Sequence, residues 1–140
     1  MNLFRSSLVL LLCGALFASC VPADEFINPL TGTWTLTGVS CQNCIDKSQI
    51  VSTTYTCDDS GCNTYTFNAD GSLKLSEILS GNAKTTNGIY SISGTTVNLN
   101  FNDSSPTKTY SFSFSGTTLY LKEIVDANTG KCGSTTVLAK

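Results

Sequence analysis

Apolar and polar residues alternate in short runs along most of this chain, from about residue 31 to the end. The polar partners are mainly Thr, Ser, Asn and Lys, which is typical of strands with one buried and one solvated face. The apolar members of the runs are Trp34 and Leu36; Val51 and Tyr55; Tyr65 and Phe67; Leu73 and Leu75; Tyr90 and Ile92; Val97, Leu99 and Phe101; Tyr110, Phe112 and Phe114; Leu119 and Leu121. No stretch shows helical spacing. The pattern therefore predicts an all-β chain of about eight short strands, with a ninth over residues 134–139.

Turn residues separate these runs, and one hairpin is repeated. Residues 90–99 (YSISGTTVNL) and 112–121 (FSFSGTTLYL) match at six of ten positions with an offset of 22. A duplicated unit and a shared solution to the same tight turn both explain the repeat. In either case we expect consecutive antiparallel hairpins, which is an up-and-down meander.

A sheet with one apolar face buries that face most simply by closing on itself, because closure also removes the exposed edges. We therefore predict a small β-barrel, with a two-sheet β-sandwich as the alternative. A barrel of about eight strands has room for side chains or for one small ligand. The residues expected inside are Trp34, Leu36, Tyr55, Phe67, Leu75, Ile92, Leu99, Phe112 and Leu121.

The N-terminus is typical of a targeting segment. Arg5 precedes an apolar run over residues 8–17, which is shorter than the roughly 20 residues of a membrane span. The end of the run, residues 16–20 (LFASC), resembles the bacterial lipobox, in which the cysteine receives a lipid before cleavage. We expect a signal peptide over residues 1–19, a lipidated Cys20, a flexible tether over residues 20–31 and one domain over residues 32–140. A plain secretory site is the alternative.

Several short motifs resemble the bacterial lipocalin-like lipoproteins. They are Gly32-Thr33-Trp34, residues 65–71 (YTFNADG), residues 88–94 (GIYSISG) and a last hairpin ending at Leu121. The resemblance implies that Trp34 plugs the closed end of the barrel, where the family covers it with an arginine. This chain has no arginine after Arg5, so Lys122 or Lys140 would have to substitute, or the contact is absent. By the same resemblance, Val21 after the lipidated cysteine implies sorting to the outer membrane.

Seven cysteines are present, of which we expect Cys13 to leave with the signal peptide and Cys20 to take the lipid. In an oxidising compartment we expect disulfides among the other five. They are Cys41, Cys44, Cys57, Cys62 and Cys132. A simple meander places the first two at the end opposite Trp34 and the last three near Trp34. Strand parity turns Cys57 inward and Cys62 outward, so we expect one of them to pair with Cys132, leaving the odd thiol at the closed end. A bridge between Cys57 and Cys62 is the alternative, and it would require a bulge.

Cys41 and Cys44 form a C-x-x-C motif that carries three interpretations. The first is a short disulfide that stiffens a loop. The second is a two-thiolate site for Cu(I), because soft ligands favour that ion; the motif also resembles an envelope-stress lipoprotein with C-x-x-C after the first strand of its lipocalin-like barrel. The third is a four-thiolate zinc site with Cys57 and Cys62, which the meander disfavours.

Composition narrows the chemistry further. The chain lacks histidine, which argues against zinc hydrolases and against Ser-His-Asp or Cys-His enzymes. Its formal charge of −2 and the absence of a basic stripe argue against nucleic acid. Most acids fall in expected turns, and Glu77 and Glu123 lie near strand ends without a visible partner. We expect no catalytic residues, no cofactor and no metal.

These observations favour a lipid-anchored barrel of the cell envelope, without catalytic activity, that binds a small hydrophobic molecule. One alternative is an interaction or sensing module, in which the Cys41–Cys44 loop meets an envelope protein or copper. The other is a purely structural lipoprotein domain.

Overall fold

The computed structural model describes residues 28–42, 51–125 and 132–140, and the described chain is built of nine β-strands. The strands are β1 (Gly32–Gln42), β2 (Val51–Thr54), β3 (Gly61–Phe67), β4 (Ser72–Leu79), β5 (Asn82–Ser93), β6 (Thr96–Phe101), β7 (Lys108–Ser115), β8 (Thr118–Glu123) and β9 (Gly133–Ala139). Each coincides with one of the alternating runs, so the predicted all-β class is confirmed. The described residues include no helix long and apolar enough to span a membrane.

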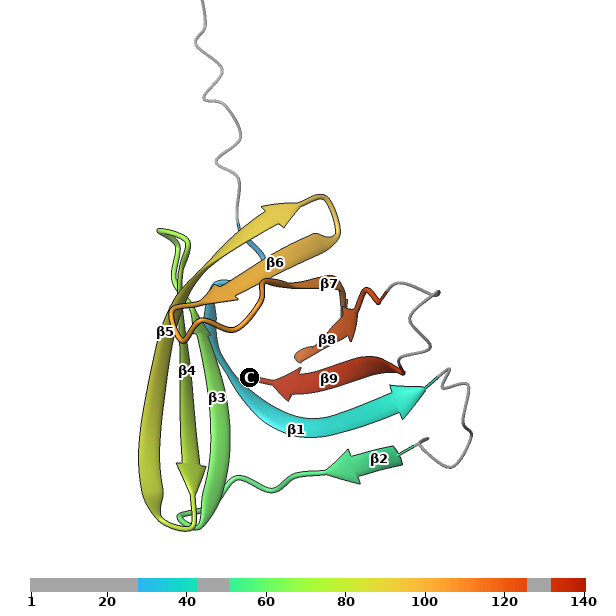
Figure 1. The fold of residues 1–140 in the computed structure, drawn as a ribbon. Helices are drawn as coiled ribbons and strands as arrows, with labels where there is room; N and C mark the ends of the chain where they lie inside the picture. Colours follow the sequence, from blue (N-terminus) through green and yellow to red (C-terminus); the bar gives the residue numbers. More distant parts are fainter. Residues whose placement is uncertain (1–27, 43–50, 126–131) are drawn as a thin grey trace, which may run out of the picture.

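The sheet closes into a barrel (Figure 1). Strands β3 to β9 pair antiparallel with their sequence neighbours, and β9 also pairs with β1, from Thr35 opposite Ala139 to Gln42 opposite Gly133. Closure gives hydrogen-bond partners to the backbone N–H and C=O groups that the edge strands of a flat sheet would expose. The predicted barrel is therefore confirmed, and the alternative of a two-sheet sandwich is not.

Strands β2 and β3 lie end to end along the same side of β1. Residues Gly38–Cys41 of β1 pair with β2, and residues Gly32–Thr35 pair with β3. Nine strands thus form a barrel of eight positions, because β2 and β3 are one strand interrupted by residues 55–60. Because residues 55–60 join two segments of the same strand position, each later loop lies at the opposite end of the barrel from the end that a simple meander predicts.

The repeated hairpins are the β5–β6 and β7–β8 units. Their turns are equivalent, with Ser93 opposite Thr96 and Ser115 opposite Thr118. The first turn residue is Gly94 in one and Gly116 in the other, with φ of 59° and 58°. Glycine adopts positive φ without the steric cost that a Cβ imposes, which explains why the same residue recurs.

Trp34 closes one end of the barrel. Only 2% of its surface is exposed, and its Nε1 donates a hydrogen bond of 2.7 Å to the carbonyl oxygen of Leu30. The Nζ of Lys140 lies 4.6 Å from the Trp34 ring centroid, so Lys140, and not the exposed Lys122, covers the tryptophan. A Cβ on Gly32 would lie 3.1 Å from the Lys140 Cε, which favours glycine there. Leu30, placed in the tether by the sequence, is fully buried beneath this end.

The predicted interior agrees with the structure except at one residue. Trp34, Leu36, Phe67, Leu99 and Leu121 are buried in one core, and Ile92 and Phe112 pack against it. Leu75 is half-buried. The assignment of Tyr55 to the interior is wrong: 45% of its surface is exposed, because the chain leaves the barrel wall just after β2. The core also contains Leu30, Leu73, Tyr90, Val97, Tyr110, Leu119 and Leu138.

Candidate functional site

The end of the barrel opposite Trp34 contains a cavity of about 260 Å³. Inward-facing side chains of β3 to β7 and the loop between β6 and β7 line it. Its apolar side consists of Leu75, Leu99 and Phe101, which we call the apolar wall. A partly polar cavity inside a closed barrel is the usual form of a small-molecule site.

Two polar side chains with little exposed surface line this cavity, and their hydroxyls have no hydrogen-bond partners among the described residues. Tyr110 is 8% exposed and Thr86 is 9% exposed, and both line the cavity. Within the part of the chain that the structure describes, no hydrogen bond reaches either hydroxyl. No fully buried side-chain nitrogen or oxygen of the described residues lacks a partner, so these two hydroxyl oxygens are accessible from the cavity. These two therefore face the cavity with their hydrogen-bonding capacity unused.

Tyr65 joins Tyr110 across the cavity, and we call these two residues the tyrosine pair. Burial is the main cause that raises the pKa of Tyr65, and the charge of Glu77 raises it further. Burial likewise raises the pKa of Tyr110, followed by the charges of Glu123 and Tyr65. Both phenols are consequently protonated at neutral pH.

Two carboxylates stand beside the tyrosine pair. Glu77 is half-buried in the cavity wall, and no ion pair to it is found within the described residues, although Lys84 is its cross-strand partner on β5. Glu123 lies opposite Tyr110 on β8 and accepts a 2.6 Å hydrogen bond from the Ser134 hydroxyl. The sequence showed both acids near strand ends without a partner, and the barrel turns them inward.

The rim of the cavity is charged and exposed to solvent. Lys84, Lys108 and Asp103 lie there. The Asp103 carboxylate accepts hydrogen bonds from the backbone N–H and the hydroxyl of Ser105, and these bonds lower its pKa. The charge of the nearby Lys84 ammonium lowers the pKa of Asp103 further.

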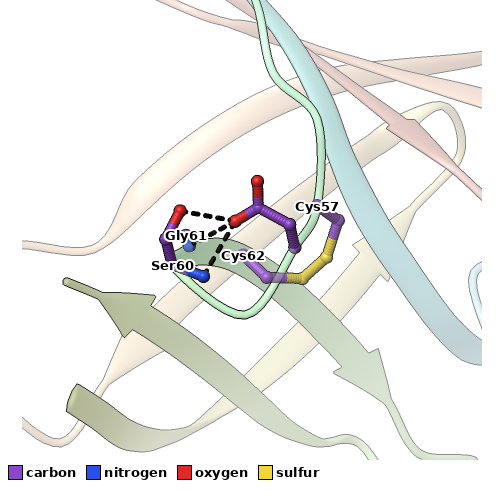
Figure 2. The surroundings of a disulfide bond; sticks show 5 residues. Cys57, Ser60, Gly61 and Cys62 are labelled. Carbon is purple, nitrogen blue, oxygen red and sulfur yellow. Dashed lines mark hydrogen bonds between the residues drawn. A yellow bond between two sulfur atoms is a disulfide. The ribbon is translucent and has the colours of Figure 1, made fainter. Parts of the chain in front are cut away.

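Figure 2 shows the disulfide between Cys57 and Cys62. It lies at the same end of the barrel as the cavity, because the adjacent Gly61 pairs with Leu79 at the end of β4. Asp58 and Gly61 exchange two backbone hydrogen bonds of 3.0 and 3.3 Å, so a two-residue turn places the cysteines directly opposite, with 4.4 Å between their Cα atoms. The Asp58 carboxylate accepts bonds from Ser60 and Gly61, which lower its pKa. A pocket of about 270 Å³ adjoins this hairpin, lined by Tyr55, Leu79 and others.

The expected pairing of Cys132 with Cys57 or Cys62 is therefore wrong. Cys57 and Cys62 lie directly opposite each other in the hairpin, and directly opposite residues point to the same face of a sheet. The predicted orientations took the parity of β2 for Cys57 and that of β3 for Cys62, although the hairpin separates these two strands. The expected location near Trp34 is wrong as well. Gly61 pairs with Leu79 at the open end, while Phe67, at the other end of β3, pairs with Gly32.

The remaining cysteines also differ from expectation. Cys41 is a free thiol, so the interpretation of a Cys41–Cys44 disulfide is wrong, and the odd thiol is not at the closed end. Cys132 is disulfide-bonded and directly precedes Gly133, which pairs with Gln42, so it lies at the open end because β9 begins there. Cys44 lies outside the described residues, as do Cys13, Cys20, Val21 and the expected signal peptide over residues 1–19.

The zinc hypothesis is excluded in its four-thiolate form, because Cys57 and Cys62 are oxidised. Within residues 28–42, 51–125 and 132–140, no three His, Cys, Asp or Glu side chains gather into a metal-binding group.

The comparisons with known proteins agree with this architecture. The model of the lipocalin-like domain family matches residues 30–121, and the chain therefore belongs to that family. The crystal structure of a lipocalin-like protein from Bacteroides uniformis ATCC 8492 aligns with a TM-score of 0.56 and 19% identity, covering 79% of this chain and 97% of that one. This likeness concerns the fold. No curated protein matches the sequence.

Proposed function

We propose that this chain is a non-catalytic binding protein that holds a small molecule in the cavity at the open end of its barrel. The observation that carries the proposal is the cavity itself, with an apolar wall and the accessible hydroxyls of Tyr110 and Thr86, which have no partner within the described residues. Such a combination provides apolar contact area together with a few polar groups that orient a ligand. The apolar wall supports the expected hydrophobic ligand, and the polar groups imply that this ligand also carries a polar end.

Titration with a solvatochromic apolar probe tests this proposal. We expect a saturable blue shift with the wild-type protein and its loss in Leu75→Phe, which fills the cavity beside the apolar wall. Ile89→Phe is the matched control, because Ile89 is 59% exposed outside the barrel. A wild-type protein without a saturable shift, or equal binding in both variants, would contradict a binding role for the cavity.

We also propose that Cys20 is lipidated and anchors the barrel to the cell envelope, at the outer membrane. The lipobox-like residues 16–20 and Val21 support this proposal. Several acyl chains hold a protein on a bilayer far more firmly than one does. Metabolic labelling with an alkyne fatty acid should mark the wild type and not Cys20→Ser, whereas Cys13→Ser should stay labelled. Labelling that survives Cys20→Ser would contradict the anchor.

A further inference from the structure

We propose that the ligand of the open-end cavity is a small amphiphilic organic cation. Its positive group would lie beside the Glu77 carboxylate and the tyrosine pair, and its apolar part would lie against the apolar wall. This inference rests on the proposed binding function and names the chemical class of its ligand.

The charged side chains of the cavity differ in their exposure to solvent. Glu77 is half-buried and has no ion pair within the described residues, whereas Lys84 and Lys108 are exposed at the rim. Long lysine side chains can keep their ammonium groups in water, and the Lys84 charge acts on Asp103. Lys84 lies directly opposite Glu77 on β5 but makes no ion pair with it, so the Glu77 carboxylate has no direct ionic partner among the described residues. Glu123 adds a second carboxylate opposite Tyr110.

The aromatic groups favour the same charge. An ammonium group is attracted to the faces of tyrosine rings as well as to a carboxylate, and both are found here. Tyr110 is 8% exposed, and its hydroxyl, which has no hydrogen-bond partner among the described residues and stays accessible from the cavity, provides an oxygen that accepts a hydrogen bond from an ammonium N–H. The carboxylates also raise the pKa of both phenols, which is the effect of a negative potential in this region.

An anionic or a neutral ligand would complement the charges of this cavity less well than a cation. An anion placed beside the tyrosine pair would approach Glu77 and Glu123, and like charges in a partly buried site repel strongly. A neutral alcohol would contact the apolar wall but would leave the Glu77 carboxylate without an opposite charge. The arrangement therefore selects for a cation over its uncharged and anionic analogues.

Three probes with one alkyl chain separate these classes: hexylammonium, hexanol and hexanoate. Binding is measured by calorimetry and by NMR shifts of the cavity residues, with the full chain purified from an oxidising compartment. We expect hexylammonium to bind at least about tenfold more tightly than the other two, as for a charge-assisted contact. Tighter binding of hexanol or hexanoate at the cavity would overturn the ligand class and leave the proposed function intact. Failure of all three to saturate the cavity would overturn both.

Substitution of Glu77 tests the role of its charge. Glu77→Gln preserves the shape of the side chain, and we expect it to weaken hexylammonium about tenfold while hexanol is unchanged. Asp59→Asn is the matched control, because it removes the same charge from an exposed residue outside the cavity. An equal loss of affinity in both variants would show an effect of net charge alone and would overturn the proposed contact. Circular dichroism confirms that each variant is folded.

Discussion

Lys140 combines two interactions at the closed end of the barrel. Its ammonium lies over the Trp34 ring and donates a 3.3 Å hydrogen bond to the carbonyl oxygen of Thr31. An ammonium over an indole face gains electrostatic energy, and its alkyl chain also shields the ring from water. Lys140, near the C-terminal end of the last strand, thus covers Trp34 in the way that the resemblance to the lipocalin-like family predicts for an arginine.

We predict that Lys140→Ala destabilises the fold by about 0.5–1 kcal/mol, the usual size of a partly exposed cation–π contact. Trp34 is the only tryptophan of the chain, so its emission reports directly on this end of the barrel and should shift to the red. Urea unfolding followed by that emission measures both effects. Lys122→Ala, at an exposed position, should change neither, and equal effects in the two variants would contradict the contact.

Tyr110 links the cavity to the pH dependence of stability. Its pKa is raised in the folded state from a reference of 10.0, so the folded protein keeps a proton that the unfolded chain releases. The corresponding stabilisation is complete below pH 10 and is lost as the pH rises through the higher folded value. Stability should therefore fall with increasing pH above about 10.

We predict that Tyr110→Phe shows a smaller alkaline loss of stability than the wild type, because the shifted group is gone. Urea unfolding at about pH 8 and about pH 11 measures this difference. Tyr55→Phe is the control, since it removes a hydroxyl from an exposed tyrosine. If the wild type and both variants lose the same stability between the two pH values, Tyr110 is not the group that causes the alkaline loss of stability.

At the scale of elements, the hairpin between β2 and β3 is the irregular part of the barrel wall. It interrupts one strand position, and its own hydrogen bonds are few: the Asp58–Gly61 pair and the contacts of the Asp58 carboxylate. The disulfide joins its two sides over a sequence separation of 5. A covalent link of this kind mainly restricts the unfolded chain.

We predict that the double variant Cys57→Ser, Cys62→Ser is destabilised by at most about 2 kcal/mol and stays folded, since the closed loop is short. Urea unfolding without reductant compares it with Cys41→Ser, which removes a free thiol and should have little effect. A double variant that fails to fold would contradict this prediction and would show that the barrel requires the disulfide-linked hairpin in order to fold.

At the scale of the whole molecule, the barrel has a filled end and an open one. Trp34, Phe67 and Leu30 fill the first, and residues 28–31 lie across it. Asn28 donates a hydrogen bond to the Tyr90 hydroxyl, which in turn donates to the carbonyl oxygen of Asn68 at 2.7 Å. The segment just before β1 is thus part of the folded domain.

We predict that Leu30→Ala destabilises the protein by about 2–5 kcal/mol, as is usual for a fully buried leucine. Ile124→Ala, at a residue that is 54% exposed near the open end, should cost much less. Thermal and urea unfolding measure both. A small effect at Leu30 would mean that the barrel is closed without this segment.

The local pattern of the sequence determined the strands, their turns and the closed end. Alternation marks the strands of the barrel wall because burial of one face is a property of neighbouring residues, whereas β2 is exposed throughout. Gly94 and Gly116 mark their turns because positive φ is a local requirement. Trp34 and a late lysine were also recognisable from the sequence, although only the structure chose Lys140 over Lys122.

The tertiary structure alone decided the disulfides and the cavity. Local periodicity does not show that β2 and β3 share one side of β1, because that pairing joins residues distant in the chain. This long-range choice carries Cys57 and Cys62 to the open end and leaves Tyr55 exposed. Closure of β1 on β9 likewise brings Glu77, Glu123 and the tyrosine pair to one end of the barrel. Their chemistry depends on burial and mutual distance, which only the closed barrel establishes.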